Sequence, residues 1–257
     1  MTSAATTAYL LITHGSRDPR SQLGAQALVR QLQAGLEQRG AGQIAAIAHA
    51  SLELGPAPLH RQIEQFAHQV APLGVTSLKL LPLFLLPGVH VCEDLPAEIA
   101  QAQAKTAVSL LLLPHLGAEG ALLPVLKAQQ AWLASQLQAK APALSPNPSP
   151  INWVLLAHGS RRPGAQGAIA QLAQTLGASP AYWVGAPSLA DCILALQGPA
   201  GAGTSVGLLS YFFFEGGILD RLQAQLDELG LPPHRVLLSP PLGNFPEFSV
   251  AVLAHLH

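Results

Sequence analysis

Three residues in the N-terminal half carry the side chains of a transition-metal site. His14 follows a short apolar run, Glu53 lies in Ser-Leu-Glu-Leu-Gly-Pro at 51–56, and His90 lies in Gly-Val-His-Val-Cys-Glu-Asp-Leu-Pro at 88–96. Two neutral imidazoles and a carboxylate form a natural ligand set for a divalent ion such as Fe²⁺, Co²⁺ or Ni²⁺. If the apolar segments before these residues are parallel strands, their carboxyl ends meet at one edge of a sheet. We therefore expect the three side chains to converge.

An internal repeat supports this arrangement of strands. The tetrapeptide His-Gly-Ser-Arg occurs at 14–17 and again at 158–161, each time at the end of an apolar run. A second, weaker repeat relates residues 82–90 to residues 210–218, and it places Ile218 where the first copy has His90. The repeat predicts a duplicated α/β unit in which only the first half keeps both histidines.

The alternation of apolar runs with amphipathic segments predicts an α/β fold of two similar three-layer domains, each with a mainly parallel sheet. In the first half we expect strands near 8–13, 43–52, 77–86 and 107–113, and helices near 20–39, 57–71, 93–104 and 119–138. In the second half we expect strands near 151–157, 181–185, 204–213 and 235–238, and helices near 165–176, 187–197, 217–229 and 245–256.

A proline-rich segment at 141–150 predicts a linker between the two domains, because prolines interrupt both helices and central strands. The expected domains are then 1–140, which carries the active site, and 151–257, in which the site is degenerate.

Composition narrows the class of protein. The 257 residues are 49% hydrophobic, with a formal net charge of −1, which predicts a globular protein without the charge of a nucleic-acid or membrane-surface binder. Cys92 and Cys192 form no Cys-x-x-Cys pair, so a thiolate metal cluster is not supported. The first residues lack a basic signal-peptide start, and prolines break the most apolar stretch. We expect a cytoplasmic monomer.

The turn after His14 has ligand-binding chemistry of its own. Its backbone N–H groups, the Ser16 hydroxyl and the Arg17 guanidinium together suit a carboxylate or a phosphate. A purely structural role is equally consistent with one such turn, just as His90 could cap a helix and Glu53 could be a solvated carboxylate. Glu93 has the chemistry of a proton relay or a metal-delivery group, although a carboxylate at a helix start also stabilises the helix dipole.

Together, the motifs at 14–17, 51–56 and 82–96 closely resemble those of the sirohydrochlorin chelatases. These class II chelatases insert Fe²⁺ or Co²⁺ into an isobacteriochlorin-type tetrapyrrole without ATP. The resemblance extends over both halves and is to the long, internally duplicated form. Its most specific part is the motif that ends Gly-x-His-x-x-x-Asp-Leu-Pro.

This resemblance implies a role for each matching residue. His14 and His90 would be the metal-binding and proton-accepting pair, and Glu53 the carboxylate of the same pocket. In the second half His158 matches, but alignment of the following helical segments places Trp183 opposite Glu53. The second half is therefore expected to have a structural or pocket-closing role.

The resemblance also implies the ligands. The metal would be a substrate, with no permanently bound cofactor, and sirohydrochlorin would be the organic partner. Because sirohydrochlorin carries several peripheral carboxylates, arginines near the two His-Gly-Ser-Arg turns are candidate anchors. The candidate substrate-binding residues in the first half are Ser16, Arg17, Arg20 and Glu93, and the candidate anchors in the second half are Arg161 and Arg162.

Two other functions are consistent with parts of the pattern. A histidine-dependent phosphoryl-transfer enzyme also has His-Gly after a strand, but arginine normally precedes that pair, whereas Thr13 and Ala157 stand there in this chain. A non-catalytic tetrapyrrole or metal carrier could use the same fold. The chain has no Gly-x-x-x-x-Gly-Lys-Ser/Thr loop, which agrees with a reaction that does not use ATP.

Overall fold

The computed structural model describes residues 6–38, 44–140, 150–159, 166–196, 204–232 and 234–256. In the first half, strands and helices alternate in the order β1 (Thr6–Thr13), α1 (Pro19–Gln38), β2 (Ile44–Ser51), α2 (Leu59–Val70), β3 (Val75–Pro82), α3 (Leu95–Gln103), β4 (Ser109–Leu112) and α4 (Leu123–Lys140). In the second half, the order is β5 (Ile151–Gly159), α5 (Gly167–Thr175), β6 (Ala178–Val184), α6 (Leu189–Leu196), β7 (Ser205–Ser210), α7 (Gly217–Glu228), β8 (Val236–Leu238) and α8 (Pro246–His255).

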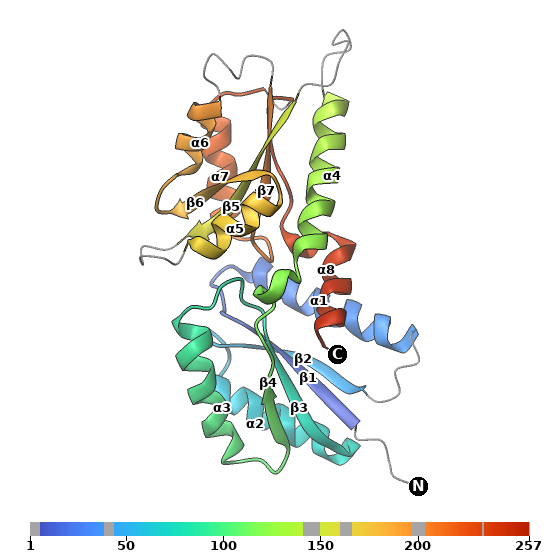
Figure 1. Ribbon diagram of the computed structural model, residues 1–257. Coiled ribbons are helices and arrows are strands. Elements are labelled where there is room, and N and C mark those ends of the chain that lie inside the picture. Colours follow the sequence, from blue (N-terminus) through green and yellow to red (C-terminus); the bar gives the residue numbers. More distant parts are fainter. Residues whose placement is uncertain are drawn as a thin grey trace. The chain divides into compact units, whose positions relative to one another are not determined.

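The eight strands form two sheets with the same topology. One sheet has the order β2-β1-β3-β4 and the other β6-β5-β7-β8 (Figure 1). All of the strand pairings are parallel. In both sheets the first strand of the repeat lies between the second and the third, so the turn after that strand lies beside the ends of both neighbours. The expected α/β fold with two similar units is confirmed.

The first sheet is packed on both faces. Leu10 and Ile12 of β1 join a buried cluster with one stripe of α2 and with Leu95 of α3. That stripe comprises Leu59, Ile63, Phe66, Ala67 and Val70, whose spacing places them on one side of the helix. On the other face, α1 lies against β2, and the side-chain amide of Gln33 donates to the Ile47 carbonyl at 3.1 Å.

The second sheet repeats this packing. Val154 and Leu156 of β5 lie in a buried cluster with Leu189 and Ile193 of α6 and with Leu222 of α7. Each of these residues is at most 3% exposed. Each sheet therefore packs against a buried apolar cluster of its own helices, which fixes the strands whose ends carry the polar residues.

Two compact units are present, and their division differs from the expected domains at two helices. One unit comprises 1–122 and 249–257, and the other comprises 123–248. The first unit thus includes the end of α8, where the Tyr9 hydroxyl donates to the Leu256 carbonyl at 2.7 Å. The second includes α4, where the Gln129 amide donates to the Ser210 and Pro240 carbonyls. Apart from Pro150, the expected linker at 141–150 lies outside the described residues.

Some element ends also differ from the sequence-based predictions. The third strand ends at Pro82 and does not continue to 86. Leu83 still donates to the Ile12 carbonyl, but the chain then pairs with the segment after β4, where Leu116 and Gly117 donate to the Pro82 and Phe84 carbonyls. His90 consequently lies in a turn beyond the strand rather than at its end.

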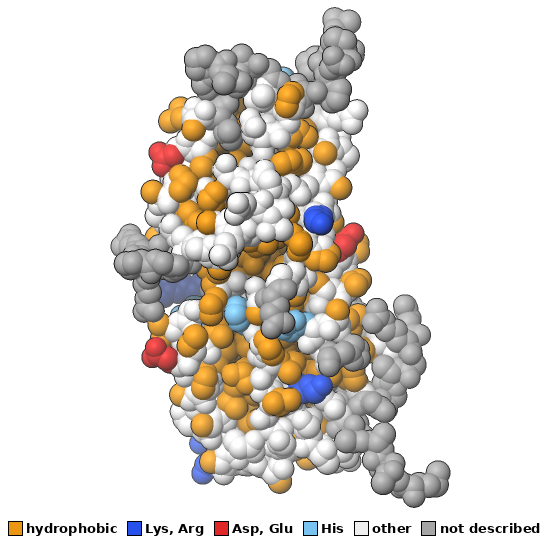
Figure 2. Space-filling model, in the orientation of Figure 1, with side chains coloured by type: hydrophobic (Ala, Val, Ile, Leu, Met, Phe, Trp, Pro, Cys, Tyr) orange, Lys and Arg blue, Asp and Glu red, His pale blue; other side chains and the backbone are white. Residues whose placement is uncertain are grey.

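Charged residues make up 11% of the chain. On the face shown in Figure 2, charged side chains are few and are scattered among hydrophobic and uncharged groups. Within the described ranges, none of the helices is both long and apolar enough to span a membrane.

Candidate metal-binding site

His14, Glu53 and His90 converge, as the sequence predicted. One potential ligand atom from each residue lies within 4.8 Å of the other two. The Nε2 atoms of His14 and His90 are 3.1 Å apart, and the two rings are nearly perpendicular, at 88°. With metal–nitrogen bonds of about 2.1 Å, this separation corresponds to an angle of about 95° at a shared ion. The pair is therefore arranged as two adjacent ligands.

Glu53 is held next to His14 by the backbone. Beyond the paired strands, Leu52 donates to the Thr13 carbonyl at 2.8 Å, and Glu53 donates to the His14 carbonyl at 2.9 Å. Gly15 makes this approach possible: its φ is +99°, and a β-carbon there would overlap the Glu53 carbonyl. A glycine directly after His14 is thus required by the backbone that aligns the imidazole with the carboxylate.

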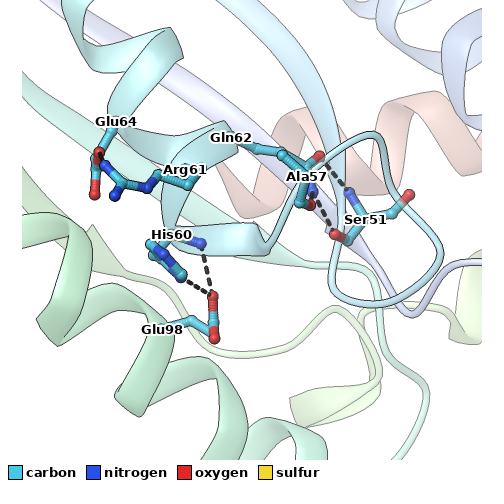
Figure 3. A network of polar contacts seen from close by, with 7 residues as sticks. All are labelled: Ser51, Ala57, His60, Arg61, Gln62, Glu64 and Glu98. Carbon is cyan, nitrogen blue, oxygen red and sulfur yellow. Dashed lines mark hydrogen bonds and ion pairs between the residues drawn. The ribbon is translucent and has the colours of Figure 1, made fainter.

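The loop that carries Glu53 is also fastened to α2. The Gln62 side chain accepts from the Ser51 N–H at 3.2 Å and donates to the Ser51 and Ala57 carbonyls at 2.8 and 2.7 Å (Figure 3). One amide therefore joins the two ends of the 51–57 loop. Nearby, His60 of α2 contacts the carboxylate of Glu98 on α3 with its backbone N–H and its Nδ1. Through these contacts α2 is joined both to the loop that carries Glu53 and to α3.

A π-helical turn positions His90. The turn spans His90–Asp94 and leads directly into α3, with the Leu95 N–H bound to the His90 carbonyl. Inserted π turns of this kind are frequent at functional sites. The turn brings Oδ2 of Asp94 to 2.7 Å from Nδ1 of His90. A carboxylate at Nδ1 favours a proton on that nitrogen, which leaves the Nε2 lone pair directed at His14.

Asp94 lies in the motif at 88–96, but no role was predicted for it from the sequence. The four-residue spacing from His90 was the signal that could have identified the contact, since such residues share a helix face. Phe84 was likewise not singled out: its ring centroid lies 6.3 Å from that of His14, in a tilted arrangement. Its apolar ring therefore lies beside the imidazole.

His49 is a structural histidine close to this site. Its Nε2 lies 2.8 Å from the Thr13 hydroxyl. Burial lowers the pKa of His49 from 6.5 to about 4, so the ring is neutral at physiological pH. Thr13 is therefore fixed by a neighbour on β2 immediately before the chain reaches His14.

Comparison with protein families identifies the chain. The model of the CbiX family matches residues 8–131 and 152–256, which include all three residues of the cluster and most of both halves. The chain belongs to the CbiX family. This confirms the family predicted from the three motifs. Among curated proteins, no sequence matches this chain significantly.

Solved structures share the fold of this CbiX-family chain. SirB from Bacillus subtilis with Fe³⁺ has a TM-score of 0.75 and 19% identity, over 98% of this chain and 94% of that one. The sirohydrochlorin chelatase SirB from Bacillus subtilis subspecies spizizenii, in complex with cobalt, has a TM-score of 0.71 and 19% identity, over 97% of this chain and 93% of that one. CbiX, the terminal enzyme for siroheme biosynthesis in denitrifying bacteria, has a TM-score of 0.63 and 20% identity, over 97% of both chains.

The remaining candidate residues of this CbiX-family chain lie near the cluster in sequence but are not part of it. Ser16 is exposed and accepts from the Asp18 N–H at 3.0 Å, and Arg17 is exposed. Arg20 is held by Asp18, with Nη2 2.6 Å from Oδ2 and Nε 3.0 Å from Oδ1. That pairing offsets the positive charge of Arg20. Glu93 is exposed in the π turn but is not among the three converging ligands.

The second copy of the motif lacks the ligand set. His158 is exposed, and its Nδ1 contacts the Gly159 carbonyl at 3.0 Å. Ile218, which replaces His90, lies in α7 and packs against the core of the second unit. Ser160, Arg161 and Arg162 lie outside the described residues.

The strand register corrects one alignment made from sequence. Gly159 pairs with Val184, and a β-carbon on Gly159 would overlap the Val184 carbonyl, as one on Gly15 would overlap that of Glu53. Val184, not Trp183, therefore occupies the position of Glu53. The alignment of the helices placed Trp183 there because it assumed that the loop before the helix has the same length in both copies. In the second copy that loop is one residue shorter. No carboxylate stands at this position in either alignment.

Proposed function

We propose that this chain inserts Fe²⁺ or Co²⁺ into sirohydrochlorin without ATP. The observation that carries the proposal is the convergence of His14, Glu53 and His90 within a CbiX-family fold. Solved proteins of the same fold, SirB with Fe³⁺ and SirB with cobalt, support a metal substrate of this kind. The product would serve siroheme or cobalamin biosynthesis.

In this proposal, His14, Glu53 and His90 hold the incoming ion. Two imidazoles and one carboxylate bind a divalent ion while leaving coordination positions open, so nitrogens of the tetrapyrrole can replace the protein ligands in steps. All three residues are partly or fully exposed, which allows a large, flat substrate to approach the ion. A phosphoryl group fits this cluster poorly, because the Glu53 carboxylate would repel its negative charge.

The same histidines balance the protons. A divalent ion enters the free-base macrocycle as two protons leave its pyrrole nitrogens, so net charge on the ring is unchanged. When the ion moves onto the ring, Nε2 of His14 and Nε2 of His90 each regain a lone pair that can accept one of those protons. Asp94 keeps His90 in the tautomer in which that lone pair exists.

Residues beside the cluster are proposed to contact the substrate periphery. Ser16 and Arg17 follow His14 directly and are exposed, which supports a role in binding peripheral carboxylates. Arg20 and Glu93 are retained as candidates, with Arg20 contributing less because Asp18 already pairs with it. The proposal also treats the metal as substrate and not as a resident cofactor.

We also propose a cytoplasmic monomer. The two similar units within one chain support monomeric function, since the duplication already supplies two copies of the fold. Light scattering should then give a particle mass near 26.8 kDa. A stable mass of twice that value would contradict this part of the proposal.

The function is tested by anaerobic initial rates with sirohydrochlorin and Fe²⁺, Co²⁺ or Ni²⁺, followed by loss of the free-base absorption spectrum. We expect acceleration with Fe²⁺, with Co²⁺ or with both, and no change on addition of ATP. Rates equal to the spontaneous reaction with both metals would refute the proposal. Stoichiometric binding without acceleration would instead identify a carrier.

A further inference from the structure

Leu54, next to Glu53, combines two unfavourable features. It is the only non-glycine residue with a positive φ among those described, at 56°. Its side chain is also 62% exposed. A left-handed backbone is unfavourable for a residue with a β-carbon, and a bulky side chain in this region usually reflects a local constraint or a function. Here the side chain gains little burial that could offset the strain.

The surrounding loop fixes this conformation. The Glu53 N–H is bound to the His14 carbonyl on one side of Leu54. On the other side, Gly55 lies so close to the Gln62 amide that a β-carbon there would be 2.6 Å from Nε2. Because both neighbours are held, Leu54 cannot turn its side chain into the core without breaking the contacts that position Glu53.

The repeat shows what the backbone alone requires. The register that matches Glu53 with Val184 also matches Leu54 with Gly185, whose φ is +110°. The second copy therefore has a positive φ at the same place and fills it with glycine, the residue that tolerates it best. The second copy also lacks the carboxylate and the second histidine. Leucine is present only where the metal ligands are present.

We propose that Leu54 is a substrate-contacting residue whose exposed side chain packs against the apolar surface of the tetrapyrrole bound over the His14, Glu53 and His90 cluster. This inference rests on the proposed function. A macrocycle with carboxylates at its periphery is apolar on its flat faces, and an exposed leucine beside the metal ligands offers a complementary surface. The contact removes apolar area from water only in the complex, so it strengthens substrate binding and leaves the free protein strained.

The experiment compares Leu54→Gly, Leu54→Asn and a matched control, Leu73→Asn. Glycine reproduces the residue of the second copy, and asparagine tolerates a positive φ while removing the apolar surface. Leu73 is a similarly exposed leucine, at 57%, but it precedes β3 and thus lies at the opposite end of the strands from the cluster. Metallation kinetics are measured against sirohydrochlorin and against Co²⁺ separately, together with melting temperatures.

We expect both Leu54 variants to raise the KM for sirohydrochlorin at least about fivefold, as loss of a partly buried leucine contact predicts. The KM for Co²⁺ should not rise and the melting temperature should not fall. The Leu73→Asn variant should have the same KM values as the wild type. An unchanged KM for sirohydrochlorin, an equal rise in the Leu73 control, or a lower melting temperature in both Leu54 variants would overturn the inference. If the wild-type protein itself fails to accelerate metallation, the proposed function fails, and the inference fails with it.

Discussion

The Nε2 atoms of His14 and His90 face each other at 3.1 Å. Two ring nitrogens at this distance form a hydrogen bond when one carries a proton and donates it to the lone pair of the other. Because Asp94 lies at Nδ1 of His90, the proton between the rings belongs to His14 when both imidazoles are neutral. A metal ion that binds both nitrogens must take the place of this proton, which the neutral His14 ring then carries on Nδ1.

Because a metal ion binds only the unprotonated form of histidine, metal binding in mildly acidic solution should displace protons from the two imidazoles. Calorimetric titration with Co²⁺ at about pH 6, in buffers of different ionisation enthalpy, should give different apparent enthalpies, and affinity should fall as pH decreases. Glu53→Gln should weaken binding while proton release persists. Identical apparent enthalpies in all buffers would show that the ion does not engage both histidines.

Asp94 should act through His90. Asp94→Asn should reduce metallation by about 10- to 100-fold, the usual effect of removing the hydrogen-bond partner of a metal-binding histidine. Asp94→Glu should recover part of the rate, and Asp227→Asn, at an exposed position of α7, should behave as wild type. Rates are followed by loss of the free-base spectrum. A fully active Asp94→Asn protein would show that Asp94 does not act through His90.

Gln62 should hold the Glu53 loop in place. Gln62→Ala leaves the Ser51 N–H and carbonyl without their partner, so we expect the free energy of unfolding to fall by about 1–3 kcal/mol. Co²⁺ affinity should fall as well, because Glu53 becomes mobile. Arg61→Ala is the control, since Arg61 contacts only Glu64 in this network (Figure 3). Lost stability with unchanged Co²⁺ affinity would mean that the amide does not position Glu53.

His49 should make stability depend on pH. Its pKa is lowered to about 4 in the folded protein, so the unfolded chain binds one more proton between about pH 4 and 6.5. Stability from this group is full above pH 6.5 and is lost as pH falls toward 4. Between pH 7 and pH 5, His49→Gln should lose about 2 kcal/mol less stability in urea unfolding than the wild type. Equal losses would place the pKa of His49 near its ordinary value.

The sequence predicted the fold and the central cluster because their signals are local. Apolar runs such as the one in β1 identify buried strands, and His14, Glu53 and His90 each stand in a distinctive motif. The resemblance then related the motifs to one another. What these patterns specify is the identity of the elements and the edge of the sheet at which they end.

Other features depend on contacts that a linear pattern does not contain. The end of β3 at Pro82 follows from pairing with the segment after β4, and the π turn at His90 follows from a backbone hydrogen bond between His90 and Leu95, five residues apart. The match between Glu53 and Val184 required the strand register. The positive φ of Leu54 is invisible in sequence, because leucine is not the residue that such a position predicts.

The central claim is that the cluster in the first unit performs the reaction and that His158 does not replace it. Its most direct test is the anaerobic rate of metallation by His14→Ala, His90→Ala and His158→Ala, each with an unchanged melting temperature. We predict losses of at least about 10²-fold for His14→Ala and His90→Ala, as expected when a proton-accepting ligand is removed, and a much smaller loss for His158→Ala. A loss at His158 equal to that at His14 would contradict the account.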